Sequence, residues 1–235
     1  MFKYTSRYCL LGMMSARFEV LGDWQGFKKN RNNAVSFDVN FVPDFKSVFF
    51  SYIYEKPKVK CYKMTQLISK FDSEFFELRG KEHCEIRETR NKFDKVVSIR
   101  AYNKEDTLGL IDLWDSQRKQ LYGWFCHSGY DRNFFSKWYD AEKDQLFSRF
   151  YYLGERMIGY AVLHQTESGY EYLIRKADCS IRNLCLYVDY KTFEQVYSGT
   201  DFFVNWGASK GSLLRYKKKF PIFSETPTYF FKQIY

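Results

Sequence analysis

The chain has 235 residues, enough for one large domain or two small ones whose core needs no disulfide or structural metal. Its 37 lysines and arginines outnumber its 28 aspartates and glutamates, which predicts polyanionic partners such as nucleic acid, anionic lipid or a phosphorylated substrate. The six cysteines form no Cys-x-x-Cys pair, the three histidines are dispersed and no apolar run approaches the roughly 20 residues that span a bilayer, so we expect a soluble protein in a reducing, cytoplasmic setting without a metal site.

Two kinds of pattern follow one another in the N-terminal part of the chain. Residues 34–42 and 47–55 read as β-strands, and a helical pattern begins near Met64. The segment "SEFFELRGKEHCEIRETRNKFDK", residues 73–95, is helical in pattern except at Gly80, which can separate two helices.

A basic arc runs beside the apolar side of this helical segment. On a continuous helical wheel it consists of Arg79, His83, Arg87 and Arg90. Two interpretations remain open. The four side chains either pair with carboxylates at a surface between domains, or they bind phosphate groups of a substrate at a cleft.

The C-terminal part alternates strands and helices. A hairpin is predicted in "LFSRFYYLGERMIGYAVLHQT", with its turn at Gly154. The other predicted elements are strands at 96–102, 183–189 and 201–204 and helices at 104–121, 134–144 and 190–199. This order predicts an α/β (α+β) fold with a mixed sheet.

The segment "NWGASKGSLLRYKKKF", residues 205–220, places several lysines on a short helix after a turn marked by Gly207 and Gly211. Lys217 projects from an apolar arc formed by Leu213, Leu214, Tyr216 and Phe220, whereas Arg215, Lys218 and Lys219 point the other way. The three outer residues predict a solvated basic face. Lys217 either extends its stem past the core or carries its charge into a cleft.

The order of elements, with the "YLGERMIGYAVL" hairpin, resembles the GNAT acyltransferase fold. Two segments narrow the resemblance. "LRGKEHCEIRETRNKFDK" followed by "IDLWD" is similar to a helix in the catalytic domain of bacterial phosphatidylglycerol lysyltransferases. "NWGASKGSLLRYKKKF" resembles the segment in those proteins and in the Fem peptidoglycan aminoacyltransferases where a glycine turn leads to an aromatic-lysine-x-x-phenylalanine helix.

This resemblance implies two GNAT-like halves in tandem. A short, degenerate first half would cover residues 1–70, a helical connector 71–95, and a complete second half 96–235. The implied activity is transfer of an aminoacyl or acyl group to an amine or hydroxyl. No bound cofactor is implied, and "RNLCLY" at 182–187 lacks the glycine-rich loop that would cradle the pyrophosphate of coenzyme A, so aminoacyl-tRNA is favoured over acyl-CoA as donor.

Within this resemblance Lys217 is the expected catalytic cation that stabilises the carbonyl oxygen. Asn205 either orients a substrate or caps the turn. Ser209 and Lys210, with the backbone amides around them, are the expected phosphate or carbonyl binders. The adjacent Cys126 and His127 predict no catalytic pair, since neighbouring residues rarely face each other.

A different class of function also fits the composition. In a non-catalytic nucleic-acid-binding module, surface aromatic rings stack on bases while lysines and arginines follow the phosphates, and aromatic residues make up 21% of this chain. The two hypotheses can merge. Nucleic acid would then be the tRNA donor, or the acceptor in the form of a hydroxymethylated base in phage-type DNA. Anionic lipid is a further possible partner.

Overall fold

The computed structural model describes residues 2–4, 18–20, 36–40, 59–122 and 129–233. Contacts divide the chain into two compact units, which we call unit 1 (residues 1–67 and 207–235) and unit 2 (residues 68–206). The predicted division at residues 70 and 95 differs from these units because residues 207–235 group with the N-terminal segment, where β10 pairs with β3.

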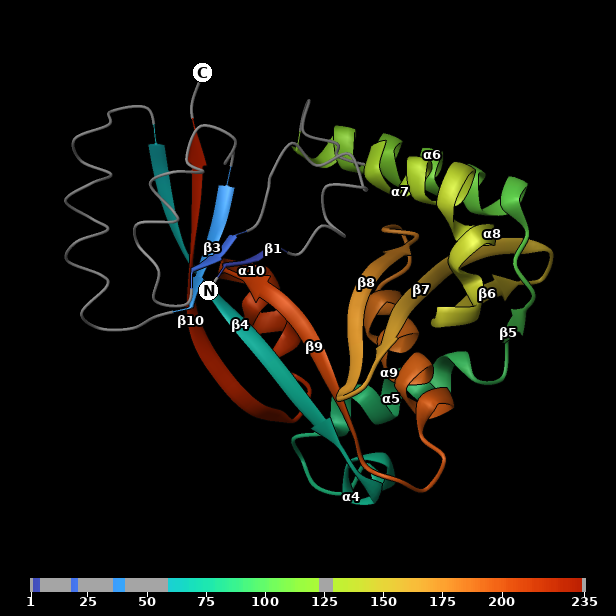
Figure 1. The fold of residues 1–235 in the computed structure, drawn as a ribbon. Coiled ribbons are helices and arrows are strands. Elements are labelled where there is room, and N and C mark those ends of the chain that lie inside the picture. The colour runs from blue at the N-terminus through green and yellow to red at the C-terminus, as the bar shows by residue number, and fades with distance from the viewer. Residues whose placement is uncertain (1, 5–17, 21–35, 41–58, 123–128, 234–235) are drawn as a thin grey trace. The chain divides into compact units, whose positions relative to one another are not determined.

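The described part of unit 1 consists mainly of strands. They are β1 (Phe2–Tyr4), β2 (Phe18–Val20), β3 (Ser36–Asn40), most of β4 (Val59–Phe71) and β10 (Ile222–Gln233), with the short helix α10 (Gly211–Lys217). β10 runs antiparallel to β3, from Thr228 opposite Asn40 to Lys232 opposite Ser36 (Figure 1). The predicted strand at 34–42 is confirmed at its centre, and the one at 47–55 lies outside the described residues.

Unit 2 contains a sheet in the order β4-β9-β8-β7-β6-β5. Its strands are β5 (Val97–Arg100), β6 (Leu146–Leu153), β7 (Arg156–Thr166), β8 (Gly169–Ala177) and β9 (Phe202–Ser209), which continues into unit 1. Its helices are α4 (Ser73–Glu77), α5 (Cys84–Phe93), α6 (Lys104–Tyr122), α7 (Gly129–Asn133), α8 (Tyr139–Glu142) and α9 (Leu184–Val196). A π-helical turn, Phe134–Trp138, joins α7 to α8, and a 3₁₀ turn, Lys143–Gln145, follows.

Strands β5 to β8 form an antiparallel meander with helices on both faces (Figure 1). On one face, α9 packs against β6, β7 and β8 and is itself covered by α5, while α6 contacts β7 and β8 from the other face. The α9 side of the core contains Tyr151, Ile158, Tyr187 and Val188, all almost completely buried. Because the hydrophobic free energy grows with the apolar area buried, these large side chains contribute strongly to the stability of unit 2.

The predicted α/β order and the hairpin are confirmed, but two elements were misassigned. The segment from Met64 is a strand rather than a helix, because Leu67, Ser69 and Phe71 are buried in alternation. Residues 184–189 belong to α9, whose N-cap residue is Asn183, rather than to a strand. A strand does precede this helix, as the predicted order requires, but it is β8 (Gly169–Ala177), which the sequence did not predict.

Candidate active site

The parallel strands β8 and β9 pair over only part of their length. Tyr170 lies opposite Val204 and Glu171 opposite Asn205, and the pairing ends there although β8 continues for six more residues. Gly169 begins β8 with φ +134°, and a Cβ atom on it would lie 2.4 Å from the Phe203 carbonyl oxygen. Glycine therefore allows the strands to meet closely at this end, and the residue pairs of the two strands end at Glu171.

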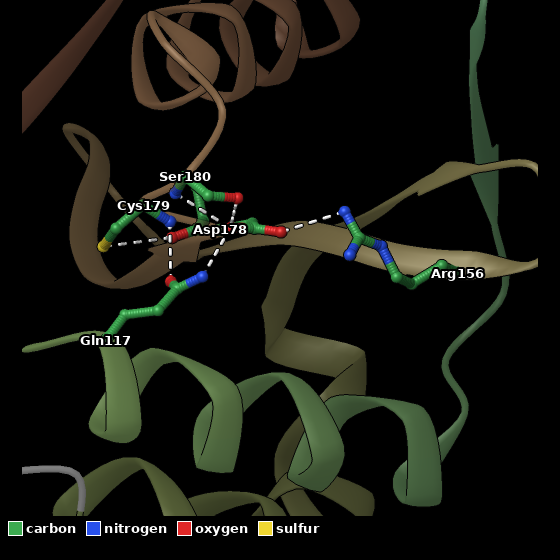
Figure 2. Close-up of polar contacts among 6 residues, drawn as sticks. Gln117, Arg156, Asp178, Cys179 and Ser180 are labelled. Carbon is green, nitrogen blue, oxygen red and sulfur yellow. Dashed lines mark hydrogen bonds and ion pairs between the residues drawn. The ribbon is translucent and has the colours of Figure 1, made fainter.

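The turn from β8 into α9 is organised by the buried carboxylate of Asp178 (Figure 2). Its Oδ1 atom accepts hydrogen bonds from the Ser180 amide (2.9 Å), the Ser180 hydroxyl (2.6 Å) and the Gln117 side-chain amide (2.7 Å). Its Oδ2 atom accepts one from Arg156 (3.0 Å). Since Gln117 comes from α6 and Arg156 from β7, side chains of two other elements hold this turn in place.

Backbone amides of the same turn are bonded inside the protein. The Cys179 amide donates to Gln117 Oε1 at 2.8 Å, and the Ser180 amide to Asp178 as described. The Ile181 amide donates to the Asp178 carbonyl at 3.2 Å, and the Leu184 amide donates to the Ile181 carbonyl at 3.3 Å. A loop that cradles a pyrophosphate presents such amides to the ligand instead.

The charge of Asp178 follows from its surroundings. Burial alone would raise the pKa of its carboxyl group, but hydrogen bonds from Ser180 and Gln117 and the nearby charge of Arg156 outweigh burial and hold the pKa below its ordinary value of 3.8. An acid with so low a pKa is a weak general base at neutral pH. Asp178 is therefore a structural anion.

A second network lies on the α9 face of the sheet. Arg175 of β8 pairs with the fully buried Asp189 of α9 at 2.8 Å, and the Tyr172 hydroxyl donates to the same carboxylate. The Tyr172 ring stacks on Trp206 with centroids 5.0 Å apart. The Trp206 indole N–H donates to the Ser69 hydroxyl at 2.7 Å. These contacts connect β4, β8, β9 and α9 through polar groups that are satisfied within unit 2.

Lys176, which follows Arg175 in β8, points to the opposite face of the sheet. Its ammonium lies 2.7 Å from the Asp131 carboxylate and 4.1 Å from the centroid of the Trp114 ring. The Tyr160 hydroxyl donates to the same carboxylate at 3.1 Å. Burial raises the pKa of Asp131 despite the opposing charge of Lys176, and burial together with Asp131 raises the pKa of Tyr160. Buried groups with shifted pKa values are candidates for proton transfer.

Sequence reasoning missed the acidic groups Asp131 and Asp178 and their partners. Asp178 lies 61 residues from Gln117, and Asp131 is 45 residues from Lys176, so no local spacing connects either pair. Only the pairing of β7 with β8 and the packing of α6 and α7 bring them together.

Lys217 ends α10 in unit 1 and is only 8% exposed, while Arg215, Lys218 and Lys219 are exposed. The predicted difference in burial between Lys217 and its basic neighbours is confirmed, and its catalytic role stays a prediction. Leu213, predicted on the same apolar arc, is 45% exposed. A helix that ends at Lys217 is too short to keep a regular apolar face.

The other predicted residues of this segment lie in the strand β9 and at its end. The expected turn at Gly207 is wrong, because β9 continues to Ser209 and α10 begins only at Gly211. Ser209 is fully buried, and its hydroxyl has no hydrogen-bond partner among the described residues. Lys210 is exposed. Asn205 is half-buried inside β9, in unit 2, so it does not cap a turn.

The predicted basic arc is not a single helical face. Gly80, with φ +86°, lies between α4 and α5, so Arg79 is on the loop between them rather than on α5. Arg79 is 84% exposed and pairs with Glu77 of α4 at 2.9 Å, a local pair rather than the expected one at a surface between domains. The Arg87 guanidinium donates to the carbonyl oxygens of Leu78 and Gly80, the latter at 3.2 Å, and so closes the loop.

The remaining residues of the arc face neighbouring side chains. His83 meets the Phe75 ring edge-on, with centroids 5.5 Å apart. Arg90 hydrogen-bonds the hydroxyl of Tyr190, a residue of α9. Of the four residues, Arg90 contacts α9, and binding of phosphate by the arc stays a prediction.

Within the part of the chain that the structure describes, no three His, Cys, Asp or Glu side chains group as a metal site requires. No helix there is long and apolar enough to cross a membrane. Cys126 and His127 lie outside the described residues.

No family model and no curated protein matches the sequence, but solved structures are similar to this one. A conserved protein of unknown function from Bacteroides thetaiotaomicron VPI-5482 has a TM-score of 0.61 at 11% identity, over 92% of this chain and 79% of that one. FemX has a TM-score of 0.55 at 10% identity, over 89% and 75%. The C-terminal domain of a putative lysylphosphatidylglycerol synthetase from Agrobacterium fabrum has a TM-score of 0.51 at 12% identity, over 89% and 72%.

A tandem GNAT protein from the clavulanic acid biosynthesis pathway is also similar, with a TM-score of 0.51 at 8% identity over 94% of this chain and 76% of that one. This chain has a GNAT-like fold. The predicted resemblance to GNAT-fold proteins, FemX and lysylphosphatidylglycerol synthetase among them, is confirmed for the fold.

Proposed function

We propose that this protein is an acyltransferase that moves an aminoacyl group from aminoacyl-tRNA to an amine or hydroxyl acceptor. The GNAT-like fold and its likeness to FemX and to a lysylphosphatidylglycerol synthetase domain support a transferase. The choice of donor goes beyond the fold and needs an observation of its own.

The turn between β8 and α9 provides that observation. It contains no glycine, and the amides of Cys179, Ser180, Ile181 and Leu184 already have acceptors inside the protein. Releasing the Ser180 amide to bind a pyrophosphate would remove a hydrogen bond from the buried Asp178 carboxylate, at a cost of about 1–3 kcal/mol. A donor without a pyrophosphate that needs cradling, such as an aminoacyl ester of tRNA, avoids this cost.

The reaction requires few groups from the protein. The acceptor nitrogen or oxygen attacks the carbonyl carbon of the ester, the bond from that carbon to the tRNA ribose oxygen breaks, and the acceptor's proton is transferred to the leaving ribose oxygen. Because the ester is already activated, positioning and one cation near the carbonyl oxygen provide much of the catalysis. We assign that cation to Lys217, and orientation of the substrate by Asn205 stays a prediction.

The donor is tested by offering the purified full chain either tRNA charged with labelled amino acids or labelled acetyl-coenzyme A. Each donor is mixed with extracts of lipid, DNA, RNA and cell-wall precursors as acceptors. We expect label to leave tRNA faster than by spontaneous hydrolysis and to appear in one acceptor fraction. The DNA fraction includes DNA with hydroxymethylated bases, which tests a nucleic-acid acceptor directly.

Two results would contradict the proposal. Transfer from acetyl-coenzyme A and not from aminoacyl-tRNA would mean that the turn rearranges to hold a pyrophosphate. Tight tRNA or DNA binding with no transfer from either donor would favour the non-catalytic nucleic-acid-binding module.

A further inference from the structure

The excess positive charge of the chain is confined to one of its two units. Unit 1, with 96 residues, contains 17 lysines and arginines against 6 aspartates and glutamates, a formal net charge of +11. Unit 2 contains 20 against 22, a net charge of −2. The net charge of +9 that the whole chain carries therefore arises entirely in unit 1.

This division changes which basic residues are candidates for binding a polyanion. In unit 2, basic side chains such as Arg87, Arg156 and Arg175 bind carbonyl or carboxylate oxygens of the same unit. In unit 1, acidic residues are too few to balance the basic ones. A concentrated positive charge raises the local concentration of a polyanion and speeds its association.

The described part of unit 1 shows where some of this charge lies. Arg215, Lys218 and Lys219 are exposed around the end of α10, and Phe223 at the start of β10 is 63% exposed. Lys218 pairs with Glu225 at 2.7 Å, the only acidic residue in 207–235. Exposed cations and exposed aromatic rings together are what proteins use to bind single-stranded nucleic acid, through phosphates and base stacking.

An anionic bilayer would also attract this charge. Interfacial binding, however, needs a contiguous apolar face in addition to lysines and arginines. Among the described side chains of unit 1, the exposed large apolar ones are Leu213 and Phe223. Two such residues bury little area, so nucleic acid is the partner that this surface fits better.

We propose that unit 1 is the nucleic-acid-binding part of this protein and that Arg215, Lys218, Lys219 and Phe223 belong to its contact surface. The inference extends the proposed function, because it places the contact with the tRNA donor in unit 1 and not on α5. It differs from the predicted basic arc, whose residues lie in the unit with net negative charge.

The test compares two triple variants of the full chain that remove the same charge. One carries Arg215→Gln, Lys218→Gln and Lys219→Gln in unit 1. The control carries Lys119→Gln, Lys137→Gln and Lys143→Gln, three exposed residues of unit 2. Binding of fluorescein-labelled, uncharged tRNA is measured by anisotropy at several salt concentrations, and circular dichroism melting checks that both variants are folded.

Each lost phosphate contact lowers the slope of log affinity against log salt by about 0.7–0.9. We therefore expect the unit 1 variant to lower the slope by about 2–3 and the control to leave it unchanged. Equal slopes for the two variants would overturn the proposal, as would binding to vesicles of phosphatidylglycerol with none to tRNA. Should the unit 1 triple variant not fold, Arg215→Gln against Lys119→Gln gives the same comparison with a change of about 0.7–0.9.

Uncharged tRNA cannot donate an amino acid, so this measurement is independent of catalysis. Binding that depends on unit 1 without any transfer would contradict the proposed function alone. Transfer from aminoacyl-tRNA that is indifferent to the unit 1 variant would contradict this inference alone.

Discussion

A methyl group placed on Gly159 would come within 2.8 Å of the Cγ2 atom of Val188. Gly159 lies in the central strand β7, and Val188 lies in α9, which packs across that strand. The same methyl group would be 3.4 Å from the Lys176 carbonyl oxygen. The absence of a side chain at residue 159 is therefore what lets α9 lie close to the sheet.

Gly159→Ala should destabilise the protein by about 1–3 kcal/mol, because α9 must move away or Val188 must leave its rotamer. The control is Gly109→Ala in α6, where the added methyl group meets nothing within 4 Å. That change should stabilise by about 0.5–1 kcal/mol, because alanine favours a helix over glycine. Urea unfolding of both variants measures this, and a neutral Gly159→Ala would show that α9 is packed more loosely than described.

Asp178→Asn should destabilise the protein by about 1–3 kcal/mol at neutral pH, because a buried ionised acceptor with four hydrogen bonds is replaced by a neutral group. The pKa of Asp178 is lowered by folding, so the unfolded chain binds the proton more tightly and the contribution increases with pH. The stability difference between wild type and variant should be fully present well above pH 3.8 and decrease as the pH falls below it.

The control for this prediction is Asp112→Asn, which removes the exposed partner of Arg132. A surface pair contributes about 0–1 kcal/mol, so this variant should differ little from wild type. A stability difference for Asp178→Asn that stays constant from pH 7 to pH 3 would contradict the assignment of a structural anion.

Arg87→Ala should lower stability by about 1–2 kcal/mol, since the Leu78 and Gly80 carbonyl oxygens lose a charged donor. Arg79→Ala removes a similar charge from a side chain that is 84% exposed and should change stability by less than about 1 kcal/mol. Thermal melts and tRNA-binding assays of both variants are compared. Unchanged stability of Arg87→Ala together with weaker binding would instead support the predicted phosphate-binding arc.

Lys217→Met should reduce the single-turnover transfer rate about a hundredfold to a thousandfold, as expected when a charge that stabilises a developing oxyanion is removed. Methionine keeps the apolar stem, so folding should be largely retained at this buried position. Lys218→Met, in an exposed pair with Glu225, is the matched control: it should weaken binding of the tRNA donor but keep the wild-type single-turnover rate at saturating aminoacyl-tRNA. A wild-type rate for Lys217→Met would mean that Lys217 only extends its stem past the core.

The sequence was most informative where its pattern was local. The hairpin around Gly154 and the amphipathic helix α6 were predicted because turn residues and apolar spacing are read within a few residues. Segment 183–189 was misread because α9 is buried on most sides, and a helix without a polar face has no clear period. The strand at Met64 was missed because long-range pairing overrides local preference.

The candidate site was less predictable than the fold. The burial of Lys217 was predicted correctly from a helical wheel that is itself partly wrong, since Leu213 is exposed and Phe220 lies beyond the end of α10. Asp131 and Asp178 carried no signal at all, because their partners come from distant elements. The net charge follows from the sequence alone. That it is concentrated in unit 1 becomes known only when the structure divides the chain into two units.

The division of unit 1 into two chain segments has a consequence for synthesis on the ribosome. Strand β3 is made before unit 2, whereas the strand that pairs with it, from Thr228 to Lys232, is made after unit 2. Until then β3 lacks this partner, and an unpaired strand edge is a site for aggregation. Unit 2 is continuous in sequence and can fold first. Unit 1, which carries the excess positive charge, therefore stays incomplete in the nascent chain after unit 2 has folded.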